Sequence, residues 1–345
     1  MELLQLKKFY PVYKADDKLC IGVVGTNQFV ECDYSITTNV LVIQNLLEYG
    51  CTVEMLQRLP LLNEFLQKDM LQPLAVKPKS RSELFFQYLN IPFLTSDTLD
   101  SQILILGAGA AGATLAFLLA QFGFTNLFIV DDDIVESSDI EKTVVYRQEH
   151  IGKSKVAALE HILRENYNTD VRFLEQCPMT EFDLQKIIDD AQPKIVVKAC
   201  DPDLIFRAVL NKICFTAKIP HLHLSYAFDR INIGPFYIPG ITCCDNSFNQ
   251  YVQNTHGEHN DFLKHQKLFP QYTVHPSISF NINLLANFGL KEILFFFAQK
   301  HEYMQTAGQV IFFYPLTMQG ASIQLKCQET CPFSFMNNYP KIPHH

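Results

Sequence analysis

The sequence predicts an α/β protein in two parts: a Rossmann-like, mostly parallel sheet with helices on both faces, and a small N-terminal domain of winged-helix type. From residue 101 to about 240, short apolar strands alternate with amphipathic helices, the pattern of a parallel sheet covered by helices. Residues 1–75 instead begin with strand-like pieces and continue into short helices. The composition changes at Lys77, so we place the domains at residues 1–76 and 77–345.

Composition and charge exclude several classes of protein. The 345 residues include 36 acidic and 28 basic side chains, and a net charge of −8 argues against a non-specific nucleic-acid binder. The ten cysteines are spread along the chain and the first residues carry no signal-peptide pattern, so we expect a cytoplasmic protein. The charge-free stretch 101–130 is interrupted by glycines, so we expect strand, turn and helix there and no membrane span.

The N-terminal domain is expected to contain a hairpin, about three helices and a closing strand. Gly25-Thr26-Asn27 would join two strands of the hairpin, and Gly50 would end the first helix, which Asp33 or Ser35 can cap. The expected strands are 9–13, 20–24, 28–32 and 70–76, and the expected helices run from 33 or 35 to 49 and over 52–55 and 61–68.

The larger domain is predicted element by element from the same periodicities. The expected strands are 103–106, 127–130, 171–175, 194–199, 221–224, 234–237, 309–314 and 322–326; the expected helices are 83–89, 111–122, 154–166, 181–191, 203–217 and 281–299. Residues 241–275 are polar, and we expect a loop there.

A glycine-rich turn between a strand and a helix predicts a nucleotide site. Gly107 allows a tight turn, Gly109 lets the backbone approach a phosphate, and Gly112 allows close packing of the helix on the strand. Asp131 ends the next strand, where a carboxylate can accept a hydrogen bond from ribose. The motif by itself is compatible with either NAD or ATP.

The residues that follow favour ATP. An acidic run from Asp131 leads into Ile151-Gly152-Lys153-Ser154-Lys155, and another strand ends at Cys200-Asp201. Lysine can neutralise phosphate and a carboxylate can hold Mg²⁺, and attack on a triphosphate needs both whereas hydride transfer does not.

Residues 80–335 resemble the ThiF/MoeB superfamily of ubiquitin-activating-like adenylyltransferases, through the glycine loop, the Val-Asp-x-Asp-x-Val-Glu run, Ile-Gly-Lys-x-Lys, and Ala-Cys-Asp followed by Arg207 and Asn211. The resemblance implies activation of a carboxylate by MgATP in a homodimer. It also implies that Asp201 holds Mg²⁺ and that Arg81 reaches the triphosphate of the neighbouring subunit. The implied catalytic residues are Asp201, Lys155 and Arg81, and the implied ATP-binding residues are Gly107, Gly109, Gly112, Asp131, Asp133, Asp139, Lys142 and Lys155.

Two parts of the phosphate motif depart from the family pattern. Ala110 stands where the loop usually has glycine, and Ser138-Asp139-Ile140-Glu141-Lys142-Thr143 replaces Ser-Asn-Leu-x-Arg-Gln. Lys142 keeps the charge of arginine without its bidentate fork, and Asp139 adds a negative charge that is unfavourable near phosphate unless it is paired. We therefore expect altered handling of the phosphates.

The cysteines predict a lost zinc site and no thioester nucleophile. The family's two Cys-x-x-Cys pairs are reduced here to Cys244 with Ser247 and Cys331 with Ser334, and serine is a poor zinc ligand. Cys243 and Cys327 are possible substitutes, but adjacent cysteines rarely chelate one ion. Cys177, Cys200 and Cys214 are nucleophile candidates by position only, and we expect Cys200 and Cys214 to be buried.

The N-terminal domain narrows the resemblance to the branch that modifies ribosomally made precursor peptides in antibiotic biosynthesis. In that branch a winged-helix-like clamp holds a leader peptide as an added strand. We expect activation of a glutamate side chain, followed by condensation and dehydration to a cyclic core. The alternatives are adenylylation of a peptide C-terminus, activation of a ubiquitin-like or sulfur-carrier protein, an NAD-dependent oxidoreductase, and a binding protein with a decayed nucleotide site.

Overall fold

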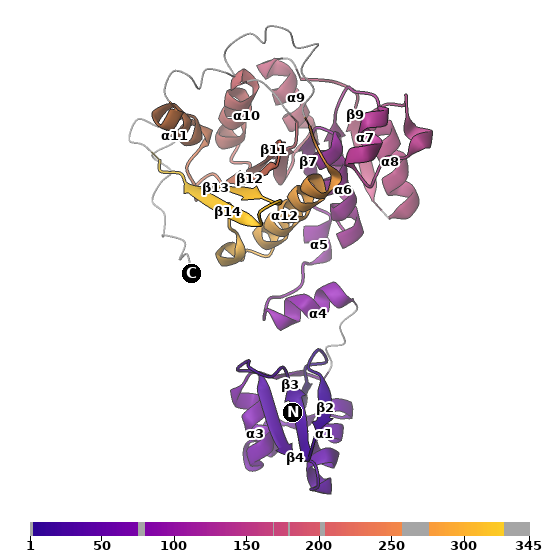
Figure 1. Ribbon diagram of the computed structural model, residues 1–345, viewed down its shortest axis with the longest axis vertical. Coiled ribbons are helices and arrows are strands. Elements are labelled where there is room, and N and C mark those ends of the chain that lie inside the picture. Colours follow the sequence, from indigo (N-terminus) through magenta and orange to yellow (C-terminus); the bar gives the residue numbers. More distant parts are fainter. Residues whose placement is uncertain are drawn as a thin grey trace. The chain divides into compact units, whose positions relative to one another are not determined.

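The computed structural model describes residues 3–74, 80–167, 169–178, 180–200, 204–256 and 276–327. It divides the chain into two compact units (Figure 1), a first unit of Met1–Phe93 and a second unit of Leu94–His345.

The first unit combines two small sheets with helices. In one sheet β1 (Leu3–Leu6) pairs antiparallel with both β5 (Cys51–Thr52) and β6 (Leu71–Pro73). The other is an antiparallel meander of β2 (Val12–Ala15), β3 (Lys18–Gly22) and β4 (Phe29–Asp33). The helices are α1 (Thr37–Glu48), α2 (Val53–Arg58), α3 (Pro60–Gln67) and α4 (Arg81–Tyr88).

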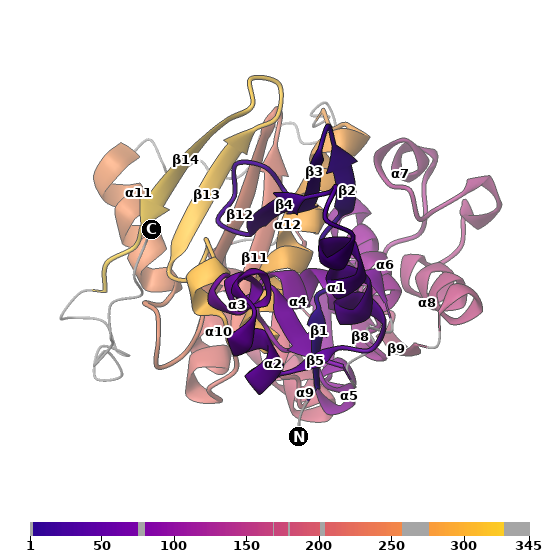
Figure 2. The same ribbon diagram turned by 90° about the horizontal axis from the view of Figure 1, so that it is seen from below.

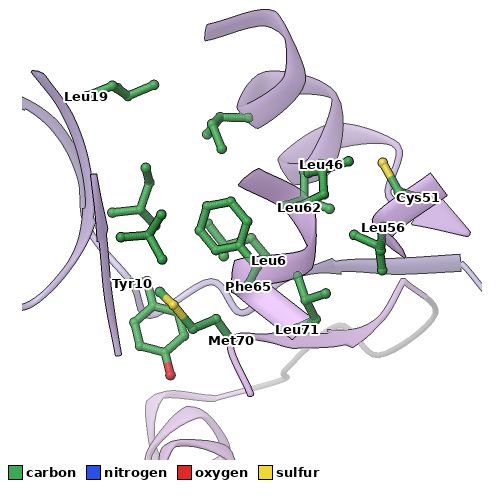
Figure 3. Packing of buried hydrophobic residues seen from close by; sticks show 13 residues of the cluster. Leu6, Tyr10, Leu19, Leu46, Cys51, Leu56, Leu62, Phe65, Met70 and Leu71 are labelled. Atoms are coloured by element: carbon green, nitrogen blue, oxygen red, sulfur yellow. The ribbon is translucent and has the colours of Figure 1, made fainter. Parts of the chain in front are cut away.

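The predicted hairpin is present as β3 and β4, whereas β1 is a strand that the sequence did not predict. The strand expected over 9–13 begins only at Val12. Leu6 of β1, Phe65 of α3 and Met70 are fully buried and lie in the same apolar cluster (Figure 3). This core joins segments some 60 residues apart, which a local pattern does not reveal.

Helix α4 belongs to the first unit, although the sequence placed it beyond the domain boundary. The Lys7 ammonium donates to Oδ1 of Asn90 at 2.8 Å, just after the helix. The ring of Tyr88 meets Phe9 edge-on, with centroids 5.6 Å apart. These contacts place the end of the first unit at Phe93 rather than at the change in composition.

The second unit has an eight-stranded sheet within its described residues, in the order β14-β13-β12-β11-β10-β7-β8-β9. The five strands from β11 to β9 are parallel, and β12, β13 and β14 join antiparallel. The strands are β7 (Ile103–Leu106), β8 (Asn126–Val130), β9 (Asp170–Leu174), β10 (Ile195–Lys198), β11 (His221–Ala227), β12 (Arg230–Tyr237), β13 (Gln309–Tyr314) and β14 (Gln319–Gln324).

Helices cover both faces of this sheet, as predicted. Leu104 and Leu106 of β7 pack with α9 (Glu181–Ala191) and α10 (Leu204–Thr216). Ile103 and Ile105, which are also buried, point to the opposite face because side chains alternate along a strand. That face carries α6 (Ala110–Phe122) and α12 (Ser279–Phe297), which pack on each other (Figures 1 and 2). The shorter helix α5 (Ser96–Leu99) and α7 (Ser137–Lys142), α8 (Lys155–Asn166) and α11 (Asp245–His256) complete the unit.

The expected loop over 241–275 is wrong in its first half, since α11 is a helix. Phe248 and Tyr251, three residues apart on this mostly polar helix, pack against a buried cluster that includes Phe215 and Leu325. Tertiary packing of two aromatic side chains therefore overrides the polar composition. Residues 257–275 lie outside the described part of the chain.

Among the described residues one helix, α12, is long and apolar enough to cross a membrane by length and composition alone. It packs against α6, β11 and β12, and 44% of its apolar 18-residue stretch is buried within the unit. This is the environment of a core helix. The charge-free stretch 101–130 forms β7, α6 and β8, as predicted.

Candidate nucleotide-binding site

The glycine loop after β7 has the geometry that its three glycines predict. Gly107 has φ +106°, and a Cβ there would lie 2.9 Å from the carbonyl of Ala199. A Cβ on Gly112 would lie 1.9 Å from the carbonyl oxygen of Gly107. Gly109 caps α6, and a Cβ there would meet nothing within 4 Å. Gly107 and Gly112 therefore serve packing, while Gly109 leaves open space at a helix N-terminus, where an anion is stabilised.

Asp131 anchors this loop from the end of β8. Its Oδ2 accepts from the Ala108 N–H at 2.6 Å and its Oδ1 from the Asp133 N–H at 2.9 Å. Burial raises the pKa of the Asp131 carboxyl, although both hydrogen bonds and the charge of Lys155 oppose the rise. The carboxylate thus fixes the turn. It also lies at the strand end where the sequence predicted a ribose-binding carboxylate.

Lys155 is the first residue of α8 and is largely buried. Its ammonium lies 2.9 Å from Oδ2 of Asp133 and 3.8 Å from Oδ2 of Asp139. Burial acts to lower the pKa of Lys155, but the hydrogen bond to Asp133 and the neighbouring carboxylate charges outweigh it, so the net shift is upward. A buried ammonium that stays charged is suited to phosphate.

Asp139, a charge that the sequence predicted to be unfavourable near phosphate unless paired, is paired. It lies in the first turn of α7, where Oδ2 accepts from the Glu136 N–H at 3.0 Å and Oδ1 lies 3.5 Å from the Lys142 ammonium. The Thr143 hydroxyl, just after α7, lies 3.0 Å from the Thr114 hydroxyl of α6. This contact places α7 and its lysine beside the helix that begins at the glycine loop.

Tyr146 is a site residue that the sequence did not predict. Its hydroxyl donates to the carbonyl of Ala108 at 2.7 Å and lies 3.3 Å from the carbonyl of Lys155. Burial, with the charges of Asp131 and Asp139, raises the pKa of Tyr146 well above its usual value, so the phenol stays protonated and can donate. A buried tyrosine needs a partner, but the sequence does not say which one.

Two predicted catalytic residues are not brought to this site by the described structure. Asp201 lies outside the described residues. A Cβ on Gly107 would lie 2.9 Å from the carbonyl of Ala199 and 3.0 Å from Cβ of Cys200. Residues 199 and 200 therefore lie beside the glycine loop. Arg81 is an exposed residue at the start of α4 in the first unit. Their assigned roles stay predictions.

The donors at this site fit ATP and a divalent cation. The open N-terminus of α6 and the ammonium groups of Lys142 and Lys155 suit phosphate oxygens. Ligand oxygens of Asp131, Asp132 and Asp133 lie within 4.8 Å of one another, the single such group of His, Cys, Asp or Glu among the described residues. Carboxylate oxygens are the donors that Mg²⁺ prefers.

The zinc-site remnant lies in an apolar environment. Cys243 and Cys244 pack with Phe215, Tyr237 and Leu325. Ser247, three residues after Cys244, is also buried, whereas Cys331 and Ser334 lie outside the described residues. No group of three cysteine, histidine or acidic ligands gathers there within the described part of the chain. The loss of zinc therefore stays a prediction.

A buried ion pair joins α10 to α11 in this region. Asp245, with no exposed surface, lies 2.5 Å from the Arg207 guanidinium and accepts from the Tyr237 hydroxyl at 2.8 Å. Its N–H donates to Oδ1 of Asn211 at 3.0 Å. Arg207 and Asn211, predicted to stand behind the Asp201 turn, thus share one partner that the sequence did not point to.

Two of the three thiol candidates, Cys214 and Cys177, lack the environment of a nucleophile, and Cys200, which was expected to be buried, is half-buried. Cys214 is fully buried, and burial raises its thiol pKa strongly. Cys177 is exposed, but partial desolvation and the charges of Asp132 and Asp131 raise its thiol pKa as well. A reactive cysteine needs a lowered pKa, so neither thiol is activated here.

The fold and this site define a member of the ThiF family, whose model matches residues 92–333, so the chain belongs to that family. The predicted relationship to ThiF and MoeB proteins is confirmed. Among curated proteins, the SAMP-activating enzyme E1 of Haloferax volcanii is 30% identical over 126 residues, covering 36% of this chain and 45% of that protein. The chain spans less than half the length of the curated relatives it matches.

Three solved structures match nearly the whole chain. Escherichia coli MccB bound to ATP aligns with a TM-score of 0.76 at 19% identity, covering 96% of this chain and 99% of that one. The same microcin C7 biosynthetic enzyme in complex with N-formylated MccA gives a TM-score of 0.75 at 18% identity, with the same coverage. PaaA aligns with a TM-score of 0.65 at 19% identity, covering 92% of this chain and 99% of that one. At these identities the likeness establishes a shared fold.

Proposed function

We propose that this chain is an ATP-dependent adenylyltransferase that modifies a ribosomally made precursor peptide in the cytoplasm. The observation that carries the proposal is the open N-terminus of α6 at Gly109, within a ThiF-family domain. The Tyr146 hydroxyl joins the backbone of Lys155 to the glycine loop, and the contact between Thr143 and Thr114 joins the end of α7, with Lys142, to α6. The fold shared with MccB, which has been solved with ATP and with MccA, supports a peptide as the second substrate.

In the proposed reaction a peptide carboxylate attacks the α-phosphate of ATP, an acyl-adenylate forms, and pyrophosphate leaves. Lys155 and Lys142 offset charge on the phosphates, and Asp131 holds both the glycine loop and the ribose. Asp201 would hold Mg²⁺, which supplies Lewis-acid stabilisation of the phosphate oxygens when bound.

The first unit is the proposed peptide clamp. β2 and β4 are the outer strands of their sheet, so within the described residues each has one edge that pairs with no other strand. A leader peptide could pair with such an edge through main-chain hydrogen bonds.

We further propose that the activated group is a glutamate side chain and that an internal nucleophile of the peptide then displaces AMP and closes a ring. The altered phosphate contacts at Asp139 and Lys142 favour chemistry that differs from simple adenylylation. Adenylylation of a peptide C-terminus is the alternative, and activation of a Gly-Gly carrier protein is a third reading.

The test is the intact mass of a short peptide encoded beside this gene, after incubation with the protein and MgATP. Loss of water supports ring closure, and gain of an adenylate supports the alternative. Adenylylation of a Gly-Gly carrier protein but not of the peptide supports the third reading. If ATP is not consumed with either substrate, the proposed activity is wrong.

Matched variants test the assigned residues. Asp201→Ala and Lys155→Met should abolish turnover while circular dichroism and peptide binding stay unchanged.

If the protein is a homodimer and Arg81 acts across it, mixing inactive Arg81→Ala and Asp201→Ala subunits should restore part of the activity. Arg81 acts within its own subunit if the mixture shows no activity although the dimers exchange.

A further inference from the structure

A buried carboxylate occupies the place between the two lysines of the phosphate site. Asp139 is 5% exposed, with Oδ1 3.5 Å from the Lys142 ammonium and Oδ2 3.8 Å from that of Lys155. Both lysine side chains are at least three-quarters buried. Asp139 is therefore the one acidic side chain that pairs with both lysines among the described residues.

The carboxylate is fixed in that position by the backbone. Its Oδ2 also accepts from the Glu136 N–H at 3.0 Å, which ties it to the start of α7. Asp139 cannot swing into solvent without breaking this cap. Because it is buried, its field at the neighbouring phosphate site is weakly screened by water and salt.

We propose that Asp139 is a built-in competitor of the nucleotide phosphates: it shares the ammonium groups of Lys142 and Lys155 and repels any anion that approaches them. This inference rests on the proposed function, since it requires that ATP phosphates bind at these lysines. Asp139 holds both lysines in place in the empty site, and it weakens the binding of ATP and of the pyrophosphate that must leave.

Asp133 provides an internal comparison, because it also pairs with Lys155, at 2.9 Å, but its side chain is 68% exposed. An exposed charge is screened by solvent, so its repulsion of phosphate is small and falls further with salt. Glu141, exposed on the same helix as Asp139, forms no ion pair with either lysine among the described residues and offers an equal change of charge as a control.

The experiment is calorimetric titration of the full chain with MgATP and, separately, with magnesium pyrophosphate, at low and at high salt. Asp139→Asn keeps an oxygen for the Glu136 N–H and should bind both ligands roughly tenfold more tightly at either salt. Asp133 is one of the three carboxylates that fit a cation, so Asp133→Asn is compared with the wild type using metal-free ATP and pyrophosphate, and it should tighten their binding by less than about threefold, and only at low salt. Glu141→Gln should bind like the wild type.

Equal or weaker binding by Asp139→Asn, with thermal unfolding unchanged, would overturn the inference while wild-type binding still supported the proposed function. Failure of the wild type to bind MgATP would instead reject the proposed function. If Asp139→Asn does not fold, Asp139→Ser, which also retains an oxygen and removes the charge, takes its place, and the same increase in affinity is required of it.

Discussion

At the scale of single residues, the glycine loop is held by side chains that are far from it in sequence. Asp131 accepts the N–H of Ala108, and the Tyr146 hydroxyl donates to the carbonyl of the same residue. Both polar groups of Ala108 are thus satisfied by side chains, which fixes the direction of the N–H groups that follow at the start of α6. The loop is preorganised before any nucleotide arrives.

Removing the Tyr146 hydroxyl should therefore loosen nucleotide binding. Tyr146→Phe keeps the ring but leaves the Ala108 carbonyl unpaired, which costs about 1 kcal/mol. We expect the dissociation constant for ATP to rise about fivefold, measured by calorimetry. Tyr167→Phe, whose ring packs on Phe117, is the matched control and should leave ATP affinity unchanged. Equal affinities for Tyr146→Phe and wild type would show that the hydroxyl does not position the loop.

Two buried histidines should make stability depend on pH. His221 and His223 on β11 are fully enclosed; burial lowers the pKa of His221 to about 4 and, with the charges of Arg207, His221 and Lys198, lowers that of His223 well below its usual value. Asp245 acts in the opposite direction on His221. The unfolded chain then binds more protons than the folded one below pH 6.5.

The stabilisation from neutral histidine is complete above about pH 6.5 and is lost as the pH falls from there toward 4. Melting temperatures measured at pH 7.5, 6 and 5 should fall across this range. His221→Phe, which keeps an aromatic ring against Phe215 and Tyr237, should reduce the fall. His161→Gln, at an exposed position, should not. A pH profile identical in all three proteins would contradict this explanation.

At the scale of elements, we expect two glycines of the turn between β7 and α6 to have different roles, Gly112 in packing and Gly109 in binding. Gly112→Ala would place a methyl group against the Gly107 carbonyl and should cost about 3 kcal/mol of stability or more. Gly109→Ala has room and an allowed φ of −64°, so it should fold normally. Its methyl group would occupy the open space, and we expect ATP affinity to fall about tenfold.

Urea unfolding and ATP titration of the two variants check this prediction together. The expected result is a large loss of unfolding free energy for Gly112→Ala and a loss of affinity without loss of stability for Gly109→Ala. The reverse assignment, with Gly109→Ala unstable or fully competent in binding, would mean that the phosphate does not approach at Gly109.

At the scale of the whole molecule, the two units have separate cores. The cluster of the first unit includes Phe65, Leu6 and Leu46 (Figure 3). Helix α4 is joined to this unit through the hydrogen bond from Lys7 to Asn90. The described residues that form the nucleotide site all belong to the second unit, whereas the contribution of Arg81 stays a prediction. The proposed peptide clamp and the nucleotide site can therefore be damaged independently.

Phe65→Ala should unfold the first unit and spare the nucleotide site. Truncating a fully buried phenylalanine costs about 3–5 kcal/mol, a large share of the stability of a small domain. We expect loss of precursor-peptide binding with ATP affinity retained, measured on the full chain by separate titrations. Phe182→Ala, at an exposed position, is the control. Joint loss of both affinities would show that the units do not fold independently.

The sequence by itself determined the α/β class, the strands and helices around the glycine turn, and membership of the ThiF family. These rest on local patterns. Strands β7 and β13 and helix α9 match their predicted bounds because the spacing of apolar residues that defines each element lies within it. The pattern also located Gly107, Gly109, Gly112, Asp131 and Lys155, since each stands at a strand end or helix start, and the predicted roles of these and the other site residues toward ATP stay predictions.

Only the tertiary structure decided the pairing of Asp139, the role of Tyr146, the helix α11 and the membership of α4 in the first unit. Each depends on contacts between segments distant in sequence, as when the Tyr146 hydroxyl meets Ala108, 38 residues away. Hydrogen bonds and burial act through space, and no local period encodes which groups they join. For that reason the sequence could say only that Asp139 is unfavourable near phosphate unless it is paired, and the fold shows it paired with both lysines.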